Sequence, residues 1–177
     1  MTTPRRLPWL VLIAAAVFTL DRLAKRWVVA HVPYGGALPF IPHVLRISHW
    51  TNEGAAFSMF ADSASPHFVN HALIAVNVLV AVCVLIALVY LGSRITLVTV
   101  ALALILGGAM GNVHDRIAYG WVIDFIEFHR VFNYQYPDFN IADSSVVTGA
   151  CLLLLDSLLP RKAQPPAQQP AEPEPQS

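Results

Sequence analysis

Residues 71–91 read HALIAVNVLVAVCVLIALVYL and are the clearest indication of the class of fold. It contains no charged side chain, and its one amide side chain is that of Asn77. An α-helix of this length reaches about 30 Å, which is the thickness of the hydrocarbon core of a bilayer. The stretch therefore predicts a helix that spans a membrane.

The rest of the chain also has the composition of a membrane protein. Of its 177 residues, 56% are hydrophobic and 12% are charged, and the mean hydropathy is +0.57. Soluble globular domains are about one quarter charged. Three further apolar stretches approach the length that a span needs. The sequence predicts an α-helical membrane protein whose four transmembrane helices lie at about residues 8–30, 71–91, 95–112 and 144–159.

The basic residues at the ends of the expected spans predict the orientation. Lys and Arg are enriched on the cytoplasmic side of membrane proteins. Here they precede the first span, separate the second from the third and follow the fourth: Arg5, Arg6, Arg94, Arg161 and Lys162. Both termini are therefore expected in the cytoplasm, and the two long loops, residues 31–70 and 113–143, on the outer side.

The chain is expected to form one integral membrane domain over residues 1–162. Residues 163–177 are rich in Pro and Gln and offer almost nothing to bury, which predicts a disordered tail. The two cysteines fall within expected spans, so a disulfide framework is not expected. The formal net charge is zero, which gives no reason to expect a nucleic acid as partner.

Short strands are expected in both outer loops. Residues 37–50, ALPFIPHVLRISHW, and residues 121–128, WVIDFIEF, combine β-branched and aromatic residues between turn signals. They predict a small extracytoplasmic β-sheet. The following run, residues 51–58 (TNEGAAFS), is consistent with a tight turn that approaches a ligand closely, and equally with an ordinary turn.

Two aspartates stand at the rims of apolar segments, where a carboxylate is expensive and therefore suggests function. Asp124 lies between Ile123 and Phe125, and such neighbours raise the pKa of a carboxyl group. Asp143 immediately precedes the fourth expected span, where it would cap the helix and the helix dipole would favour its charged form. Environments of this kind divide acid and base roles between two carboxyl groups. The alternatives are a simple helix cap for Asp143 and an ion pair with Arg116 for Asp124.

Other chemistries have weaker support in the sequence. The seven histidines show no spacing typical of metal ligands, such as HExxH, so no metal and no cofactor is expected. The serines lack a recognisable nucleophile setting, and both cysteines are expected in helices. Acid and base catalysis by the two aspartates is the chemistry that remains.

Five motifs occur in order along the chain. They are Asp21-x-x-x-Lys25, TNEGAAF at 51–57, GGAMGNVHDR at 107–116, VIDF at 122–125 and FNIAD at 139–143. Each is weak by itself, but the ordered set resembles the bacterial lipoprotein signal peptidases, or signal peptidase II, a family of aspartic intramembrane peptidases. The resemblance spans nearly the whole chain except its two ends.

The resemblance implies an activity and a set of site residues. It implies four spans in the inner membrane, small extracellular β elements, and cleavage of a signal peptide from a diacylglyceryl-modified prolipoprotein immediately before the lipidated cysteine. The catalytic dyad would be Asp124 and Asp143, near the periplasmic face. The motif positions that would support the dyad or bind substrate are Asn52, Gly54, Asn112, Asp115, Arg116, Asn140 and Ala142, and the first helix would carry the structural polar pair Asp21 and Lys25.

The expected partners are the prolipoprotein signal peptide and membrane lipid, and the enzyme is expected to be a monomer. In the expected mechanism Asp124 holds the proton and Asp143 is ionised, although two coupled carboxyl groups titrate as a pair. A small proton-coupled transporter and a non-catalytic membrane assembly factor remain alternatives. The transporter has less support, because the acidic residues cluster at one rim of the membrane.

Overall fold

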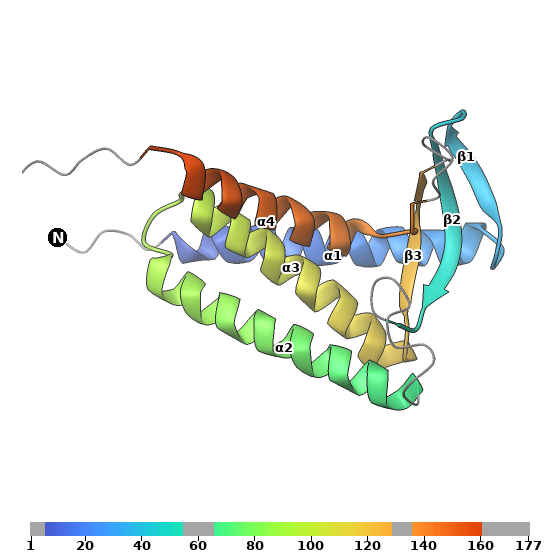
Figure 1. The fold of residues 1–177 in the computed structure, drawn as a ribbon, viewed down its shortest axis with the longest axis horizontal. Helices are drawn as coiled ribbons and strands as arrows, with labels where there is room; N and C mark the ends of the chain where they lie inside the picture. The colour runs from blue at the N-terminus through green and yellow to red at the C-terminus, as the bar shows by residue number, and fades with distance from the viewer. Residues whose placement is uncertain (1–5, 55–65, 129–135, 161–177) are drawn as a thin grey trace, which may run out of the picture.

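Four helices and a three-stranded antiparallel sheet make up the computed structural model, which describes residues 6–54, 66–128 and 136–160. The helices are α1 Leu7–His31, α2 Pro66–Leu91, α3 Leu97–Tyr119 and α4 Ile141–Leu158, and the strands are β1 Ala37–Ile41, β2 Leu45–Asn52 and β3 Val122–Phe128. Figure 1 shows the helices side by side, with the sheet standing across one end of the bundle. All four helices are long and apolar enough to cross a membrane. The predicted fold class is thus confirmed.

Two helix boundaries on the sheet side of the bundle differ from the expected ones because polar residues continue the helices. The expected third span, residues 95–112, ended where polar residues begin, but α3 runs on to Tyr119. Asp115 and Arg116 stay within this helix because both are buried against protein rather than lipid. α2 begins at Pro66 rather than at residue 71.

The two remaining boundary differences come from helix caps. The side chains and backbones of Thr96 and Thr99 bond reciprocally, so α3 begins at Leu97, two residues later than expected. The fourth span was expected at residues 144–159, but Asn140 caps it and α4 begins at Ile141. The outer connections are therefore shorter than the expected 31–70 and 113–143. The tail at 163–177 lies outside the described residues.

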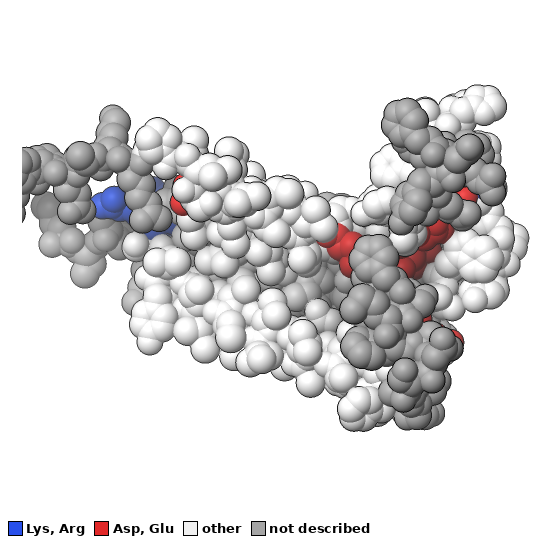
Figure 2. Space-filling model, viewed as in Figure 1, with Lys and Arg blue, Asp and Glu red and all other residues white. Residues whose placement is uncertain are grey.

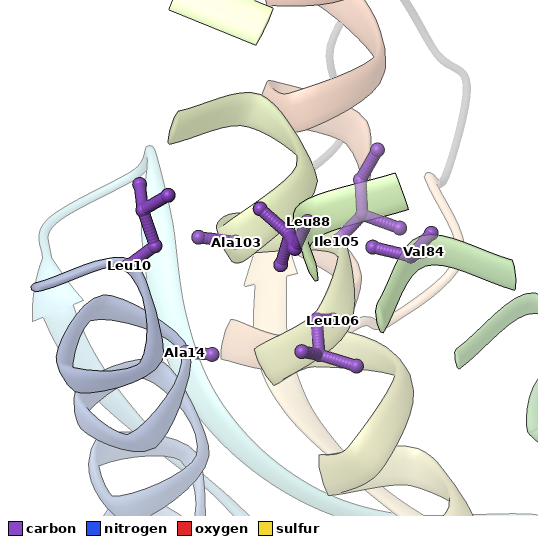
Figure 3. Close-up of a cluster of buried hydrophobic side chains, with 7 residues drawn as sticks. All are labelled: Leu10, Ala14, Val84, Leu88, Ala103, Ile105 and Leu106. Atoms are coloured by element: carbon purple, nitrogen blue, oxygen red, sulfur yellow. The ribbon is translucent and has the colours of Figure 1, made fainter. Parts of the chain in front are cut away.

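α3 is the central helix and packs against each of the other three. Figure 3 shows one cluster of buried side chains in this bundle, with Leu10 and Ala14 from α1, Val84 and Leu88 from α2, and Ala103, Ile105 and Leu106 from α3. By contrast, many large apolar side chains of α2 point outward, among them Leu79 and Ile86. Lipid is the environment that such side chains require.

Two adjacent glycines bring α3 close to its neighbours. A methyl group added at Gly108 would lie 2.4 Å from the carbonyl oxygen of Ala142, and one added at Gly107 would lie 2.6 Å from that of Ala14. Backbones that approach this closely pack well in a membrane, where small residues line helix interfaces. The first turn of α4, which carries Asp143, therefore lies directly against α3.

Gly108→Ala is expected to destabilise the protein by about 1–3 kcal/mol, because overpacking would push the start of α4 away from α3. Gly54→Ala is the matched control, since a methyl group there would meet no atom of the described residues within 4 Å. Thermal unfolding in detergent measures both variants. Equal melting temperatures for the two variants would show that the α3–α4 contact tolerates an extra methyl group.

The sheet has the order β1-β2-β3, so both predicted strand regions are confirmed. β2 pairs with β3 so that Trp50 lies opposite Asp124 and Thr51 opposite Ile123. Since successive side chains point to opposite faces of a sheet, Asp124 and Ile123 belong to different faces. One face of the sheet therefore presents the carboxyl group of Asp124, and the other presents the apolar side chain of Ile123.

Charge is concentrated at the two ends of the long axis. On the face shown in Figure 2, the middle of the helical bundle is white. Acidic side chains gather where the sheet meets the bundle, and basic side chains appear at the opposite end. A belt without exposed charge suits the hydrocarbon core of a bilayer.

Candidate active site

Asp124 lies in β3 and is almost fully buried, with 4% of its surface exposed. Two side-chain amides donate to its carboxylate: Asn52 Nδ2 to Oδ2 at 3.0 Å and Asn140 Nδ2 to Oδ1 at 2.8 Å. Asn52 reaches it from the end of β2, and Asn140 from the residue before α4. Three segments that are distant in the sequence thus meet at one carboxyl group.

Burial raises the pKa of Asp124 to about 7, and the nearby charge of Asp143 acts in the same direction. The hydrogen bonds from Asn52 and Asn140 act in the opposite direction, because they favour the charged form. Desolvation outweighs them. Asp124 is therefore a carboxyl group that can hold a proton near neutral pH.

Asp143 is the third residue of α4 rather than its N-cap, which corrects the expected position. The cap is Asn140, whose Oδ1 accepts from the Asp143 amide N–H at 2.9 Å, while Asp143 Oδ2 accepts from the Asn140 N–H at 3.2 Å. Asn112 Nδ2 donates to Asp143 Oδ1 at 2.7 Å. These donors and the helix N-terminus stabilise a negative charge at this carboxylate.

Asn140 joins the two aspartates. Its side chain is completely buried, and it donates to Asp124 through Nδ2 while its Oδ1 accepts from the backbone of Asp143. The same Nδ2 also lies 3.3 Å from Asn112 Oδ1. The structure therefore brings together both predicted aspartates and the three predicted amides, Asn52 included.

Lys25 connects this group to a buried set of charges. Its Nζ lies 2.7 Å from Asp21 Oδ2 and 2.8 Å from Asp115 Oδ2, and all three side chains are fully buried. It also lies 3.4 Å from Asn112 Oδ1, which in turn positions Asp143. The expected polar pair of Asp21 and Lys25 is present, and Asp115 makes it a triad.

Asp21 also supports the start of α4. Its Oδ1 accepts from the backbone N–H of Ala142 at 3.0 Å. Ala142 is completely buried and lies against α3, so its contribution comes from its backbone and its small size. α1 thus fixes the turn of helix that presents Asp143.

Arg22 is a charged residue of this network that the motif positions did not include. It forms an ion pair with Asp115 Oδ1, and its Nη2 donates to the hydroxyl of Tyr119 at 3.1 Å. The sequence contained a partial signal, because Arg22 and Lys25 are three residues apart and share a face of the helix. The sequence could not show that Asp115 forms ion pairs with both of them.

Arg116 and Gly54 lie beside the aspartates. Arg116 Nη2 is 3.5 Å from the carbonyl oxygen of Gly54, whose N–H donates to Asn52 Oδ1 at 3.1 Å. Asn70 Nδ2 is 3.4 Å from the carbonyl oxygen of Arg116, a contact that the sequence did not suggest. Within the described residues Arg116 makes no ion pair with Asp124. The alternative that Asp124 simply pairs with Arg116 is therefore wrong.

The described part of the chain has no group of three or more His, Cys, Asp or Glu side chains arranged to hold a metal ion. What the arrangement offers is a pair of carboxyl groups in unlike environments. One is buried in β3 with a raised pKa, and the other is at a helix N-terminus. Such a pair can exchange a proton with a bound water molecule.

Comparison with known proteins identifies the family. The family model described as Signal peptidase (SPase) II matches residues 13–159, which include every residue of the site. The chain belongs to the signal peptidase II family. Membership makes it a peptidase, and the four apolar helices make it a multi-pass membrane protein.

Curated signal peptidases II are similar over most of their length. The lipoprotein signal peptidase of Pseudomonas aeruginosa (strain UCBPP-PA14) is 39% identical over 158 residues, which cover 89% of this chain and 92% of the relative. That of Serratia proteamaculans (strain 568) is 38% identical over 159 residues and 89% of each chain. That of Acinetobacter baumannii (strain ATCC 17978) is 36% identical over 165 residues, which cover 92% of this chain and 89% of the relative.

Solved structures share the fold. A bacterial membrane enzyme determined by the in meso method at 2.3 Å resolution superposes with a TM-score of 0.73 at 30% identity, covering 89% of this chain and 92% of the other. A second, at 1.9 Å resolution, gives a TM-score of 0.70 at 30% identity, covering 89% and 97%. The bundle with a sheet across one end is thus an architecture that solved membrane enzymes also have.

Proposed function

We propose that this signal peptidase II is an aspartic endopeptidase that removes the signal peptide of a diacylglyceryl-modified prolipoprotein, cutting immediately before the lipidated cysteine. The observation that carries the proposal is the single buried amide of Asn140, which bonds both Asp124 and Asp143. Family membership and the names of the curated relatives support the substrate class. We propose that it acts as a monomer.

In this mechanism a water molecule bound by both carboxyl groups attacks the scissile carbonyl carbon. Asp143 is the ionised member and takes the proton of the water, since the α4 N-terminus and Asn112 stabilise its negative charge. Asp124 is the protonated member and donates a hydrogen bond to the carbonyl oxygen, since its pKa is about 7. As the C–N bond breaks, Asp143 gives the proton that it took from the water to the leaving amine, and the signal peptide departs with a new carboxylate.

We place the site near the periplasmic face of the bacterial inner membrane. The sheet and the two aspartates lie at the end of the bundle opposite to the start of α1 and the end of α4 (Figure 1). The basic residues that flank those two helix ends support a cytoplasmic location for both termini. A membrane-embedded signal peptide would then end at the depth of the aspartates.

Cleavage of a purified diacylated prolipoprotein in detergent tests the function. We expect one cut, which mass spectrometry locates immediately before the modified cysteine. The matched control is the same precursor without the diacylglyceryl group, which we expect to remain uncleaved. Cleavage at another bond, or equal cleavage of the unmodified precursor, would contradict the proposed specificity.

The rate of cleavage is expected to fall as the pH rises through about 7, because Asp124 must hold its proton. The folded-state pKa of Asp124 lies above its ordinary value of 3.8. Its contribution to stability is therefore present below about pH 4 and is lost as the pH rises through about 7. The pH profile of kcat/KM measures the first effect.

The variant Asn52→Ala tests whether Asp124 causes this pH dependence. The hydrogen bond from Asn52 favours the charged form of Asp124, so its removal raises the pKa further. The fall in kcat/KM should move to higher pH in the variant. If the fall in kcat/KM stayed at the same pH or moved to lower pH, the deprotonation of Asp124 would not be its cause.

A further inference from the structure

A cavity lies at the same end of the bundle as the candidate active site, on the other side of the sheet from Asp124. Its volume is about 570 Å³, which is in the range of sites for small molecules. Thr51 and Ile123, which pair across β2 and β3, both line it. Their neighbours Asn52 and Asp124 bond each other in the candidate active site instead. The two sites are thus separated by the sheet.

One wall of the cavity is the last third of α1, which is one of the spans. Val29 and Ala30 give this wall an apolar surface, and the nearby Leu23 and Trp27 are 56% and 48% exposed. Tyr34, Tyr119 and Trp121 also line the cavity. The cavity therefore adjoins an exposed apolar side of α1.

Among the described residues that line the cavity, one basic and one acidic side chain lack a charged partner. Arg22 and Lys25 contribute to its wall, but the buried Asp115 and Asp21 already neutralise them. Arg26 on α1 and Glu53 just after β2 also line the cavity, and both are exposed. Neither has an ion pair or hydrogen bond with any described residue.

We propose that this cavity binds a phospholipid whose headgroup carries both a phosphate and an ammonium group, as phosphatidylethanolamine does. Arg26 binds the phosphate, because a guanidinium matches the geometry of its oxygens. Glu53 binds the ammonium, for which Tyr34 and Trp121, which also line the cavity, offer aromatic rings. The acyl chains extend along the exposed apolar side chains of α1.

The charge pair predicts selectivity as well as binding. An anionic headgroup without an amine, such as that of phosphatidylglycerol, leaves Glu53 unpaired and close to a negative phosphate. When their acyl chains are identical, the two lipids therefore differ in their interaction with Glu53 but share the interaction of their phosphate with Arg26. Opposite responses of the two lipids to substitution of Glu53 distinguish this site from general attraction of lipid to basic residues.

Native mass spectrometry of the detergent-solubilised full chain, titrated with each lipid, tests the proposal. Wild-type protein should bind phosphatidylethanolamine about tenfold more tightly than phosphatidylglycerol. Arg26→Gln should weaken both by about tenfold, and Arg26→Lys should restore part of the loss. Glu53→Gln should weaken phosphatidylethanolamine but strengthen phosphatidylglycerol. The control is Arg94→Gln, at an exposed position beyond the other end of the bundle, which should change neither.

Several outcomes would overturn the proposal. Equal affinity of the wild-type protein for both lipids would show that Glu53 does not bind the ammonium. If Arg26→Gln bound both lipids as well as Arg94→Gln does, Arg26 would not bind the phosphate. Equal binding of glycerophosphoethanolamine, which has no acyl chains, would show that the ligand is not a membrane lipid. Arg26 and Glu53 are exposed, so both variants should melt at the wild-type temperature without lipid.

Discussion

Asp124→Asn and Asp143→Asn are each expected to lower kcat for cleavage of a diacylated prolipoprotein by about 10²- to 10⁴-fold, the usual worth of a positioned acid or base. Asparagine has nearly the shape of aspartate but cannot exchange the proton. Asn140 can still donate to an amide oxygen at position 124, and Asn112 to one at position 143, so each variant keeps one of the two hydrogen bonds that its carboxylate accepts and should fold.

The double variant should be hardly slower than either single variant, because the two carboxyl groups act as one unit. Asp156→Asn is the matched control, since it lies on α4 thirteen residues after Asp143, or about 20 Å along the helix. Its turnover should equal that of the wild-type enzyme. Appreciable turnover in a correctly folded Asp124→Asn variant would show that the two aspartates are not the dyad.

Lys25→Met is expected to destabilise the protein by about 3–5 kcal/mol, because it removes the cation from a buried group of charges. Its Nζ lies within 3 Å of carboxylate oxygens of both Asp21 and Asp115. Asp115 keeps its ion pair with Arg22, whereas Asp21 is left without a cation. Methionine fills a similar volume, so the loss reports charge rather than a cavity.

Thermal unfolding in detergent measures this effect, and a double variant assigns its cause. Asp21→Asn combined with Lys25→Met should be more stable than Lys25→Met alone, because the unpaired buried charge is gone and the amide oxygen can still accept from Ala142. Arg94→Met, which removes an exposed cation, should change stability by no more than about 0.5 kcal/mol. If Lys25→Met were equally mild, the buried charges would have to be compensated elsewhere.

The membrane class and most helix positions could be predicted because they depend on local composition. α1 lies within one residue of its expected bounds, since both depend on where the apolar run ends. The extension of α3 to Tyr119 could not be predicted in the same way. Whether a polar residue such as Asp115 ends a span depends on whether protein or lipid surrounds it.

The candidate site was partly predictable for a similar reason. Spacing along one helix placed Asp21 and Lys25 on a common face, four residues apart. It could not show that Asp115, ninety residues later in the chain, offers Lys25 a second carboxylate. The capping role of Asn140 was also missed, because the helix was expected to start next to Asp143, whereas α4 begins two residues before it, at Ile141.

The order of the residues was enough to predict that this chain spans a membrane, that it carries short strands in its outer loops, and which ordered motifs it shares with signal peptidase II. These properties follow from hydropathy, turn residues and residue identity, which are local. The tertiary structure alone decided that Asn140 bonds both Asp124 and Asp143, and that Arg26 and Glu53 face one cavity. Such contacts depend on how the helices and the sheet pack, and packing energy is shared among segments far apart in the chain.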